Sequence, residues 1–293
     1  MTGEQKRKNR QNMEIKPNKV LSLGVGVQTV ALYYLSSMGI IERCEHAIFS
    51  DTGGEKTKTL EYYELLLTWM EQNNGIPLHK ATYKNLKKDL LNQTNSSNNR
   101  FASIPAFTMN NGEKGMLRRQ CTNEYKISQV NKKWREILGI PGRRRLPVTE
   151  IYQGITLDEA HRMTIPQEKW KIHVYPFCGY KVYPNGRCER IDSKIMSRND
   201  VINWLNKNKF PIPEKSSCVF CPFQSDQNWI RLKTTVPEDF KSAVEVDKQI
   251  RDSSIKGIKS PIYLHDSLLP LDEVNFNENQ GNLWGNCTDG CDV

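Results

Sequence analysis

The sequence contains no apolar run that approaches the roughly 20 residues needed to cross a bilayer, so we expect no membrane-spanning segment and no membrane partner. Residues 1–18 are polar and basic, and they lack the apolar stretch of a secretory signal. No internal repeat is present either. We therefore predict a cytoplasmic protein whose residues 1–18 form a flexible basic tail.

The two commonest phosphate-binding motifs are also missing. No GxxxxGK[ST] segment exists, so the chain has no P-loop lysine to reach β- and γ-phosphates. The pattern G-x-G-x-x-G fails because Thr29 occupies the position of the last glycine. Asp158-Glu159-Ala160-His161 spells a helicase box, but without a P-loop partner we interpret it as coincidence. These absences exclude two common classes of nucleotide-binding protein.

What the sequence does have is positive charge and cysteine. The chain of 293 residues carries a formal net charge of +9, which favours anionic partners such as nucleotides, RNA or DNA without choosing between them. It contains eight cysteines. In a reducing compartment cysteines are better interpreted as metal ligands or catalytic thiols than as a disulfide scaffold.

Short apolar runs alternate with segments of helical spacing in the first half of the chain. Lys19–Leu23 precedes a Gly-rich turn and a helical pattern, and His46–Ser50 precedes a helix over Lys58–Gln72. This alternation predicts an α/β fold with a doubly wound parallel sheet. We assign residues 19–170 to a nucleotide-binding domain and 171–293 to a helical or irregular region with a cysteine-containing tail. Further strands are expected at 77–82 and 149–153, further helices at 123–138 and from Ser197, and an unpatterned loop at 92–115.

The first Gly-rich turn has the features of a phosphate-binding site. Gly24 and Gly26 allow backbone amides to approach an anion closely, and the following helix offers free N–H groups and the positive end of its dipole. Ser22 and Thr29 add hydroxyl groups. A tight strand-to-helix turn without a ligand would show the same pattern.

The segment SLGVGVQTVALYYL resembles the phosphate loop of the phosphoadenosine phosphosulfate (PAPS) reductase family, within the PP-loop group of adenine nucleotide α-hydrolases. Gly26-Val27-Gln28 is similar to the reductase version of this loop, whereas the Asp and the second Ser of the usual SGGxDS motif are missing. The resemblance covers residues 19–162, because three more segments follow in the family's order. They are Asp51-Thr52-Gly53, the segment Arg118–Lys126, and Gly154 with Asp158, Glu159 and Arg162.

The resemblance implies an adenine nucleotide, ATP or PAPS, as ligand, with Mg²⁺ to neutralise its phosphates. It implies that four basic side chains face the phosphates, those of Arg118, Arg119, Lys126 and Arg162. It also implies that Asp51 reaches a ribose hydroxyl or Mg²⁺. The nucleotide-binding residues it implies are Ser22, Gly24, Gly26, Gln28, Thr29, Asp51, Thr52, Gly53, Arg118, Gly154, Glu159 and Arg162. The catalytic residues it implies are Lys126, Arg119, Asp51, Cys287 and Cys291.

The cysteines suggest two alternative roles. Cys218 and Cys221 form a CxxC, Cys121 lies in the segment that resembles the family, and Cys287 and Cys291 lie in the tail. Four such thiolates are able to hold a [4Fe–4S] cluster or Zn²⁺. Alternatively, a tail cysteine is the nucleophile of a reductase. The remaining cysteines, Cys44, Cys178 and Cys188, are expected to be buried or to have no functional role, and Cys178 and Cys188, which flank a hairpin-like segment, remain alternative ligands.

Three functions remain open from the sequence. The first is an enzyme that cleaves ATP between its α- and β-phosphates, adenylates an acceptor such as tRNA or DNA, and then lets sulfur from a donor protein replace AMP. The second is a sulfonucleotide reductase in which Cys287 or Cys291 takes the sulfuryl group of PAPS. The third is a non-catalytic protein that binds nucleic acid or another partner through the same fold.

Overall fold

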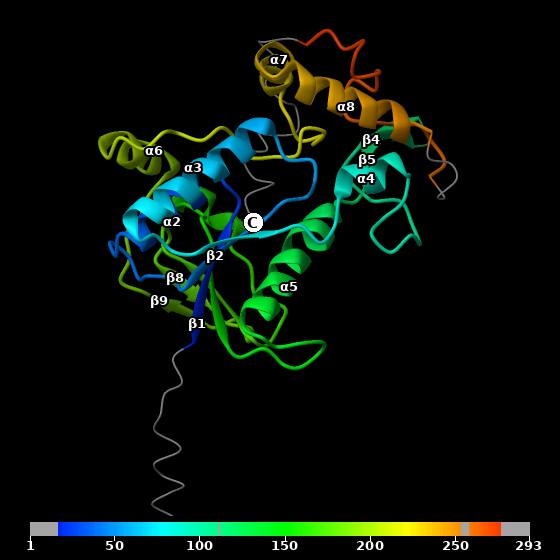
Figure 1. Cartoon of the computed structure of the whole chain (residues 1–293). Coiled ribbons are helices and arrows are strands. Elements are labelled where there is room, and N and C mark those ends of the chain that lie inside the picture. The colour runs from blue at the N-terminus through cyan, green and yellow to red at the C-terminus, as the bar shows by residue number, and fades with distance from the viewer. Residues whose placement is uncertain (1–16, 111, 253–257, 277–293) are drawn as a thin grey trace, which may run out of the picture.

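A seven-stranded sheet forms the centre of the computed structural model, which describes residues 17–110, 112–252 and 258–276 (Figure 1). The strand order is β3-β2-β1-β6-β7-β8-β9. The first five strands run parallel and the last two are antiparallel at one edge. The strands are β1 (Asn18–Leu23), β2 (His46–Ser50), β3 (Leu78–Ala81), β6 (Thr149–Tyr152), β7 (Lys171–Tyr175), β8 (Tyr180–Val182) and β9 (Cys188–Arg190).

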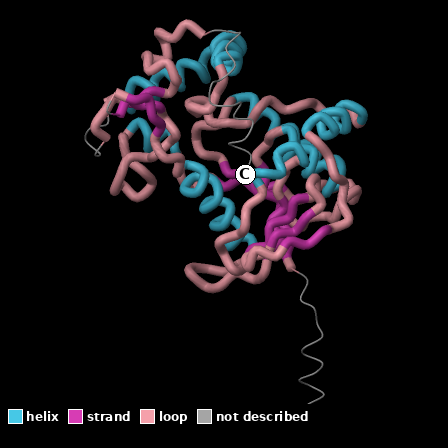
Figure 2. Tube along the Cα trace, turned by 180° about the vertical axis from the view of Figure 1, so that it is seen from behind, coloured by secondary structure: helices cyan, strands magenta, loops and turns pink. Residues whose placement is uncertain are grey.

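Helices cover both faces of this sheet, as the view from behind in Figure 2 shows. Because side chains alternate along a strand, Val20 packs in the core beneath α5, whereas Leu21 packs with α2, α3 and α6. Strands that are buried on both faces are expected to be apolar throughout, which explains the continuous apolar runs of the sequence. The helices are α2 (Val27–Ser37), α3 (Thr57–Asn73), α5 (Ser128–Ile137) and α6 (Arg198–Lys207). The doubly wound α/β fold predicted from the sequence is confirmed.

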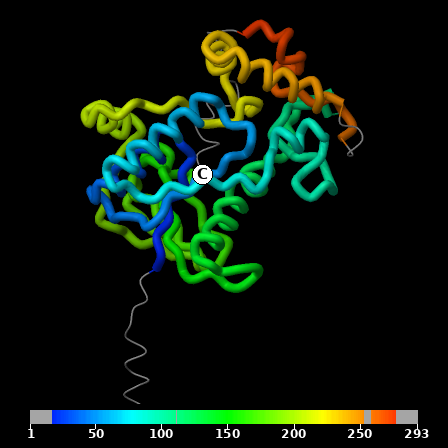
Figure 3. The backbone as a smooth tube through the Cα atoms, viewed as in Figure 1, coloured from blue at the N-terminus to red at the C-terminus, as the bar shows by residue number. Residues whose placement is uncertain are grey.

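A second lobe packs beside the carboxyl ends of the parallel strands. Its small sheet has the order β10-β4-β5, and Figure 3 shows how segments far apart in the chain meet there. One apolar core joins these strands to the helices and contains Phe220, Trp229 and Leu264. The elements of the second lobe are α4 (Leu86–Leu91), β4 (Phe107–Asn110), β5 (Glu113–Met116), α7 (Asp226–Thr235), α8 (Pro237–Ile250) and β10 (Ile262–Tyr263).

Three elements differ from the sequence-based expectation. The segment 92–115, expected to be an unpatterned loop, includes β4 and most of β5, and β4 pairs with β10 from the far end of the chain. The helix expected over 123–138 begins as a π-helix, η1 (Thr122–Ile127), and continues as α5. Strands β7, β8 and β9, which lie beyond residue 170, continue the central sheet. In the described ranges no helix is both long and apolar enough to span a membrane.

The sheet reverses its direction of growth between β1 and β6. The chain passes from β1 outward to β2 and β3, then returns to place β6 and β7 on the other side of β1. In open α/β sheets a crevice forms at such a switch point, outside the carboxyl ends of the strands. The turn that follows β1 therefore lies where this fold class binds ligands.

A pair of histidines joins β2 to β3 and gives the fold a predicted pH dependence. His46 Nδ1 lies 3.0 Å from His79 Nε2. Burial lowers the pKa of both imidazoles, with further lowering at His79 from His46 and Lys133, against the opposing charges of Glu45 and Glu136. The folded protein thus binds protons less readily than the unfolded chain. The stability that depends on neutral imidazoles is fully present above the unfolded pKa of about 6.5, and it is lost as the pH falls from there through the lower folded-state pKa.

The measurement is the free energy of unfolding in urea at pH 7.5 and at pH 5.5. We expect His79→Gln to lose less stability than the unchanged protein over this interval, because a glutamine does not titrate. His161→Gln, which changes an exposed histidine, serves as the control and should keep the original difference. An unchanged pH dependence in His79→Gln would contradict the assignment.

Candidate functional site

The turn between β1 and α2 presents the start of a helix at the switch point. Val25 adopts a positive φ of 57°, and Gly26 is the residue that caps α2. Because glycine has no side chain, no side-chain cap occupies the first-turn N–H groups, which also have no partner within the helix. Thr29 Oγ1 accepts from the Gly26 N–H at 3.2 Å and holds the turn closed. The turn is buried, and Ser22 ahead of it is 5% exposed.

Gly154 holds the loop after β6 directly against this turn. A Cβ atom at position 154 would lie 2.8 Å from the Thr29 nitrogen and 2.9 Å from the Gln28 carbonyl carbon. Real Cβ atoms essentially never come so close. The backbone of the β6 loop and the first turn of α2 therefore meet at a separation that only glycine allows.

A buried polar network surrounds the same turn. Gln28 Nε2 donates to Glu159 Oε1 at 3.1 Å, and Gln28 Oε1 accepts from Arg198 Nη1 at 2.9 Å. Arg162 Nη1 donates to Glu159 Oε2 at 2.6 Å. Glu159 and Arg162 come from the short 3₁₀ helix η2 (Leu157–Arg162). The structure thus brings Gln28, Glu159 and Arg162 together as the sequence predicted, although they contact one another and the unpredicted Arg198.

The loop after β2 forms a second cluster at the neighbouring strand end. Asp51 Oδ1 accepts from the Gly53 N–H at 2.8 Å. Thr52 Oγ1 donates to Glu55 Oε1 at 2.8 Å and lies 3.2 Å from Cys218 Sγ. Glu55 was not predicted from the sequence, although a carboxylate so soon after Asp51-Thr52-Gly53 was a usable signal.

Backbone contacts join the loop after β2 to the CxxC segment. The Val219 N–H donates to the Gly54 carbonyl at 2.8 Å. The Phe220 ring occupies the space beside Gly54, where a Cβ would come within 2.4 Å of the ring. The CxxC segment is therefore positioned by a loop that lies far from it in the sequence.

A small cavity of about 30 Å³ lies between this loop and η1. Its lining includes Cys121, Cys218, Cys221 and Lys126, and we call it the cysteine cavity. Lys126 Nζ lies 3.9 Å from Glu55 Oε1. The other oxygen of this carboxylate, Glu55 Oε2, is buried without a hydrogen-bond partner. The cysteine cavity thus brings a cation and three thiols together, with the carboxylate of Glu55 beside them.

The described residues alone do not complete a metal site. Within residues 17–110, 112–252 and 258–276, no three ligating side chains are arranged to hold a metal ion. The predicted ligands Cys287 and Cys291 lie outside the described residues. A [4Fe–4S] cluster or Zn²⁺ on this set therefore depends on residues for which the structure gives no position.

Of the remaining cysteines, Cys44 and Cys178 are buried as expected, whereas Cys188 is exposed. Burial raises the pKa of Cys44 to about 12 and that of Cys178 to about 11. A thiol with so high a pKa is protonated and unreactive at neutral pH. Cys188 lies exposed on β9.

Arg118 and Arg119 line a separate, larger cavity of about 630 Å³ on the other side of η1. Arg119 Nε and Nη2 donate to Thr122 Oγ1 at 2.8 and 2.6 Å. Arg118 is exposed. We call this space the polar cavity; its lining is Lys84, Asn95, Ser96, Ser97, Asn99, Arg100, Arg118, Arg119, Gln120, Asn123, Glu124 and Ser128.

Comparison with known proteins gives a likeness to solved structures alone. No protein-family model matches the chain, and no curated protein matches it. Among solved structures, the chain is similar to a phosphate complex of phosphoadenylyl-sulfate (PAPS) reductase from Candida auris, at 12% identity and a TM-score of 0.37. The match covers 71% of this chain and 81% of the reductase chain. At this identity and TM-score the likeness does not identify a shared activity.

Proposed function

We propose that this protein is an enzyme that binds an adenine nucleotide, with its phosphates at the turn between β1 and α2, and acts at the α-phosphate. The observation that carries the proposal is the first turn of α2, which has no side-chain cap and is held by Gly154 at the switch point of the sheet. Helix N-termini of this kind bind phosphate through their N–H groups and their dipole.

The proposed chemistry is mainly positioning and stabilisation of charge. Asp51, at the carboxyl end of β2, is assigned to a ribose hydroxyl or to Mg²⁺. Lys126, which is 8% exposed and 3.9 Å from Glu55, is assigned to the charge that develops at the α-phosphate. A buried cation acts more strongly than an exposed one because little water screens it.

Two routes follow from attack at the α-phosphate or at the sulfuryl group beyond it. In the first route ATP is cleaved between its α- and β-phosphates and an acceptor is adenylated before sulfur replaces AMP. In the second a thiolate of Cys287 or Cys291 attacks the sulfuryl sulfur of PAPS, the bond from sulfur to the phosphate oxygen breaks, and adenosine 3′,5′-bisphosphate leaves. The S-sulfocysteine that forms then releases sulfite when an external dithiol reductant attacks the cysteine sulfur. We route no step through a metal, because the ligand set would need one of these two cysteines, which lie outside the described residues.

A paired thermal-shift measurement tests the proposal on the full chain. ATP with Mg²⁺, PAPS, and GTP with Mg²⁺ as the control for adenine recognition are each added in excess. A ligand at about a hundred times its Kd stabilises a protein by about 2.7 kcal/mol, a rise of several degrees in Tm. We expect such a rise with ATP and a smaller one with GTP.

The pattern of shifts separates the two routes. Stabilisation by ATP together with pyrophosphate release supports the adenylating enzyme, whereas stabilisation by PAPS alone supports the reductase. If no adenine nucleotide raises the Tm, the proposal is wrong and the non-catalytic function remains.

A further inference from the structure

The helix η1 separates two cavities of different character. A π-helix within an α-helix is uncommon and frequently marks a functional site. One side of this segment lines the cysteine cavity with Cys121, Thr122 and Lys126. The other side lines the polar cavity with Gln120, Asn123, Glu124 and Ser128. A molecule bound in the polar cavity would therefore contact Arg119 directly and lie one helix away from Lys126 and the cysteine cavity.

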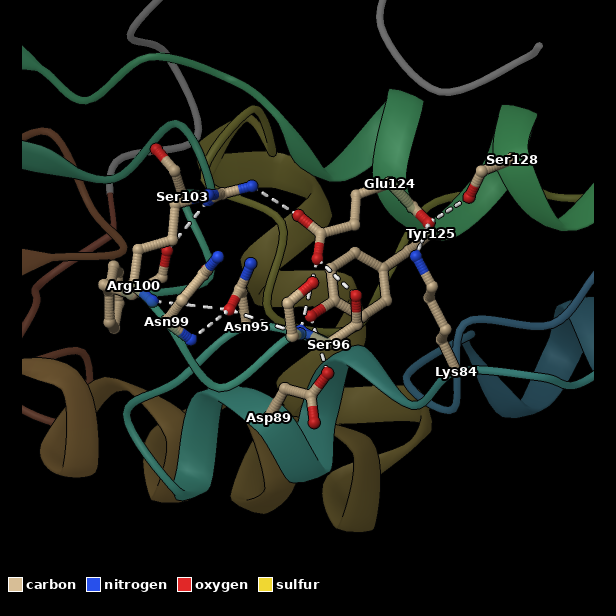
Figure 4. Close-up of polar contacts among 12 residues, drawn as sticks. Lys84, Asp89, Asn95, Ser96, Asn99, Arg100, Ser103, Glu124, Tyr125 and Ser128 are labelled. Atoms are coloured by element: carbon tan, nitrogen blue, oxygen red, sulfur yellow. Dashed lines mark hydrogen bonds and ion pairs between the residues drawn. The ribbon is translucent and has the colours of Figure 1, made fainter.

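The wall of the polar cavity is built around Glu124, as Figure 4 shows. Glu124 Oε1 accepts from the backbone N–H of Ser96 at 3.2 Å and also from the Ser96 hydroxyl. Its other oxygen, Oε2, accepts from Arg100 Nη2. Lys84 Nζ donates to the Glu124 carbonyl at 3.1 Å. The Glu124 carboxylate thus holds the loop that carries Ser96 and Arg100 on the opposite wall of the cavity, and both of its oxygens accept hydrogen bonds.

A second set of hydrogen bonds shapes the loop that faces η1. Asn95 Oδ1 accepts from the backbone N–H groups of Ser97, Asn99 and Arg100, at 3.3, 3.1 and 3.4 Å. Asn95 is 3% exposed, whereas Ser97 and Asn99 are exposed. The buried Asn95 side chain therefore holds the backbone of the loop, and the side chains of Ser97 and Asn99 are exposed at the rim of the cavity.

The charges and amides of the lining suit a nucleotide unit. Four basic side chains line the cavity against one carboxylate, and that carboxylate already binds Arg100 and Ser96. Arginine forks match phosphate oxygens. Asn and Gln amides offer paired donors and acceptors for base edges. The Gln120 Oε1 atom, on the cavity lining, is buried and has no hydrogen-bond partner.

We propose that the polar cavity binds a single-stranded nucleic acid, and that this strand is the acceptor partner of the proposed enzyme; the acceptor role rests on the proposed function. A volume of about 630 Å³ accommodates a nucleotide-sized ligand. Exposed side chains on the rim, Ser97, Asn99, Arg118 and Asn123, allow neighbouring nucleotides to continue into solvent. The net charge of +9 favours the approach of a polyanion.

Fluorescence anisotropy with a labelled single-stranded 12-mer of mixed sequence, as DNA and as RNA, tests the proposal on the full chain. We expect Arg118→Ala to weaken binding about five- to tenfold and to reduce the salt dependence by about 0.7 in log–log slope, the value for one lost phosphate contact on a single strand. Asn99→Asp, which puts a negative charge on the rim, should weaken binding to a similar extent. Arg187→Ala removes an equal charge from the distant β8–β9 hairpin and should change the affinity less than about twofold.

Two results would overturn the proposal. Equal losses in Arg118→Ala and Arg187→Ala would mean that the strand is held only by general charge. Displacement of the 12-mer by AMP at the concentration at which unlabelled 12-mer displaces it would mean that the cavity takes a free nucleotide rather than a strand.

The thermal-shift measurement separates this proposal from the proposed function. A protein that ATP or PAPS stabilises but that binds neither 12-mer would contradict the cavity assignment and leave the nucleotide site intact. A protein that binds the 12-mers with the expected variant pattern but that no adenine nucleotide stabilises would support the cavity as a strand-binding site. That result would contradict the enzymatic proposal and the acceptor role with it.

Discussion

Gly154→Ala is expected to remove nucleotide binding while leaving a folded protein. The new Cβ would lie 2.8 Å from the Thr29 nitrogen and 2.9 Å from the Gln28 carbonyl carbon, so it would clash with the backbone of the first turn of α2. Backbone cannot rotate away as a side chain can, and α2 is buried along its whole length, so the turn must shift. Overpacking of this kind typically costs about 1–3 kcal/mol of stability. We expect nucleotide affinity to fall at least about tenfold, equivalent to about 1.4 kcal/mol.

The matched control is Gly115→Ala in β5. Nothing lies within 4 Å of a Cβ at that position, and its φ is not in the left-handed region. Both the Tm and the nucleotide-induced shift should therefore stay close to those of the unchanged protein. A folded Gly154→Ala protein that keeps its full nucleotide-induced shift would show that the phosphates do not bind at the turn before α2.

The central sheet could be predicted from the sequence because its signals are local. Strands β1 and β2 are short, mostly apolar segments whose last four residues are buried, and the Gly-rich turn marks the passage from β1 to α2. The order of the motifs placed Gln28 and Glu159 in the same site, and the two side chains contact each other at 3.1 Å. Local pattern was therefore sufficient for the fold, whereas the role of Gln28 and Glu159 in binding a nucleotide stays a prediction.

The second lobe and the cavities could not be predicted, because contacts between distant segments create them. Strand β10 has two residues and pairs with β4, so neither strand carries a recognisable pattern. Glu55 and Cys218 are separated by 163 positions, and their contact depends on the packing of Phe220 against Gly54. The resemblance implied that Arg118 faces the phosphates, which stays a prediction, and in the structure its side chain lines the polar cavity. Proximity in the chain did not reveal that η1 separates two cavities.

Asp247→Ala is expected to be the most destabilising single change in the second lobe. Asp247 is fully buried in α8 and accepts from the backbone N–H groups of Leu264 at 2.9 Å and Leu271 at 3.0 Å. It also forms an ion pair with Arg251. An alanine at position 247 leaves the backbone N–H groups of Leu264 and Leu271 without their acceptor, and it leaves Arg251 without its carboxylate. Breaking a buried ion pair costs about 3–5 kcal/mol, and we expect a loss of that size in the free energy of unfolding in urea.

Asp272→Ala tests whether the loss comes from burial rather than from charge. Asp272 pairs with Lys248 at 2.6 Å on the surface of the same lobe, where both side chains are exposed. Exposed pairs contribute about 0–1 kcal/mol, so this variant should be nearly as stable as the unchanged protein. Because Leu264 and Leu271 share a core with Phe220, Asp247→Ala should loosen the surroundings of the CxxC segment but leave α2 in place. Its nucleotide-induced shift should therefore persist at temperatures where the protein is folded, and equal destabilisation by the two aspartate variants would refute this account of the second lobe.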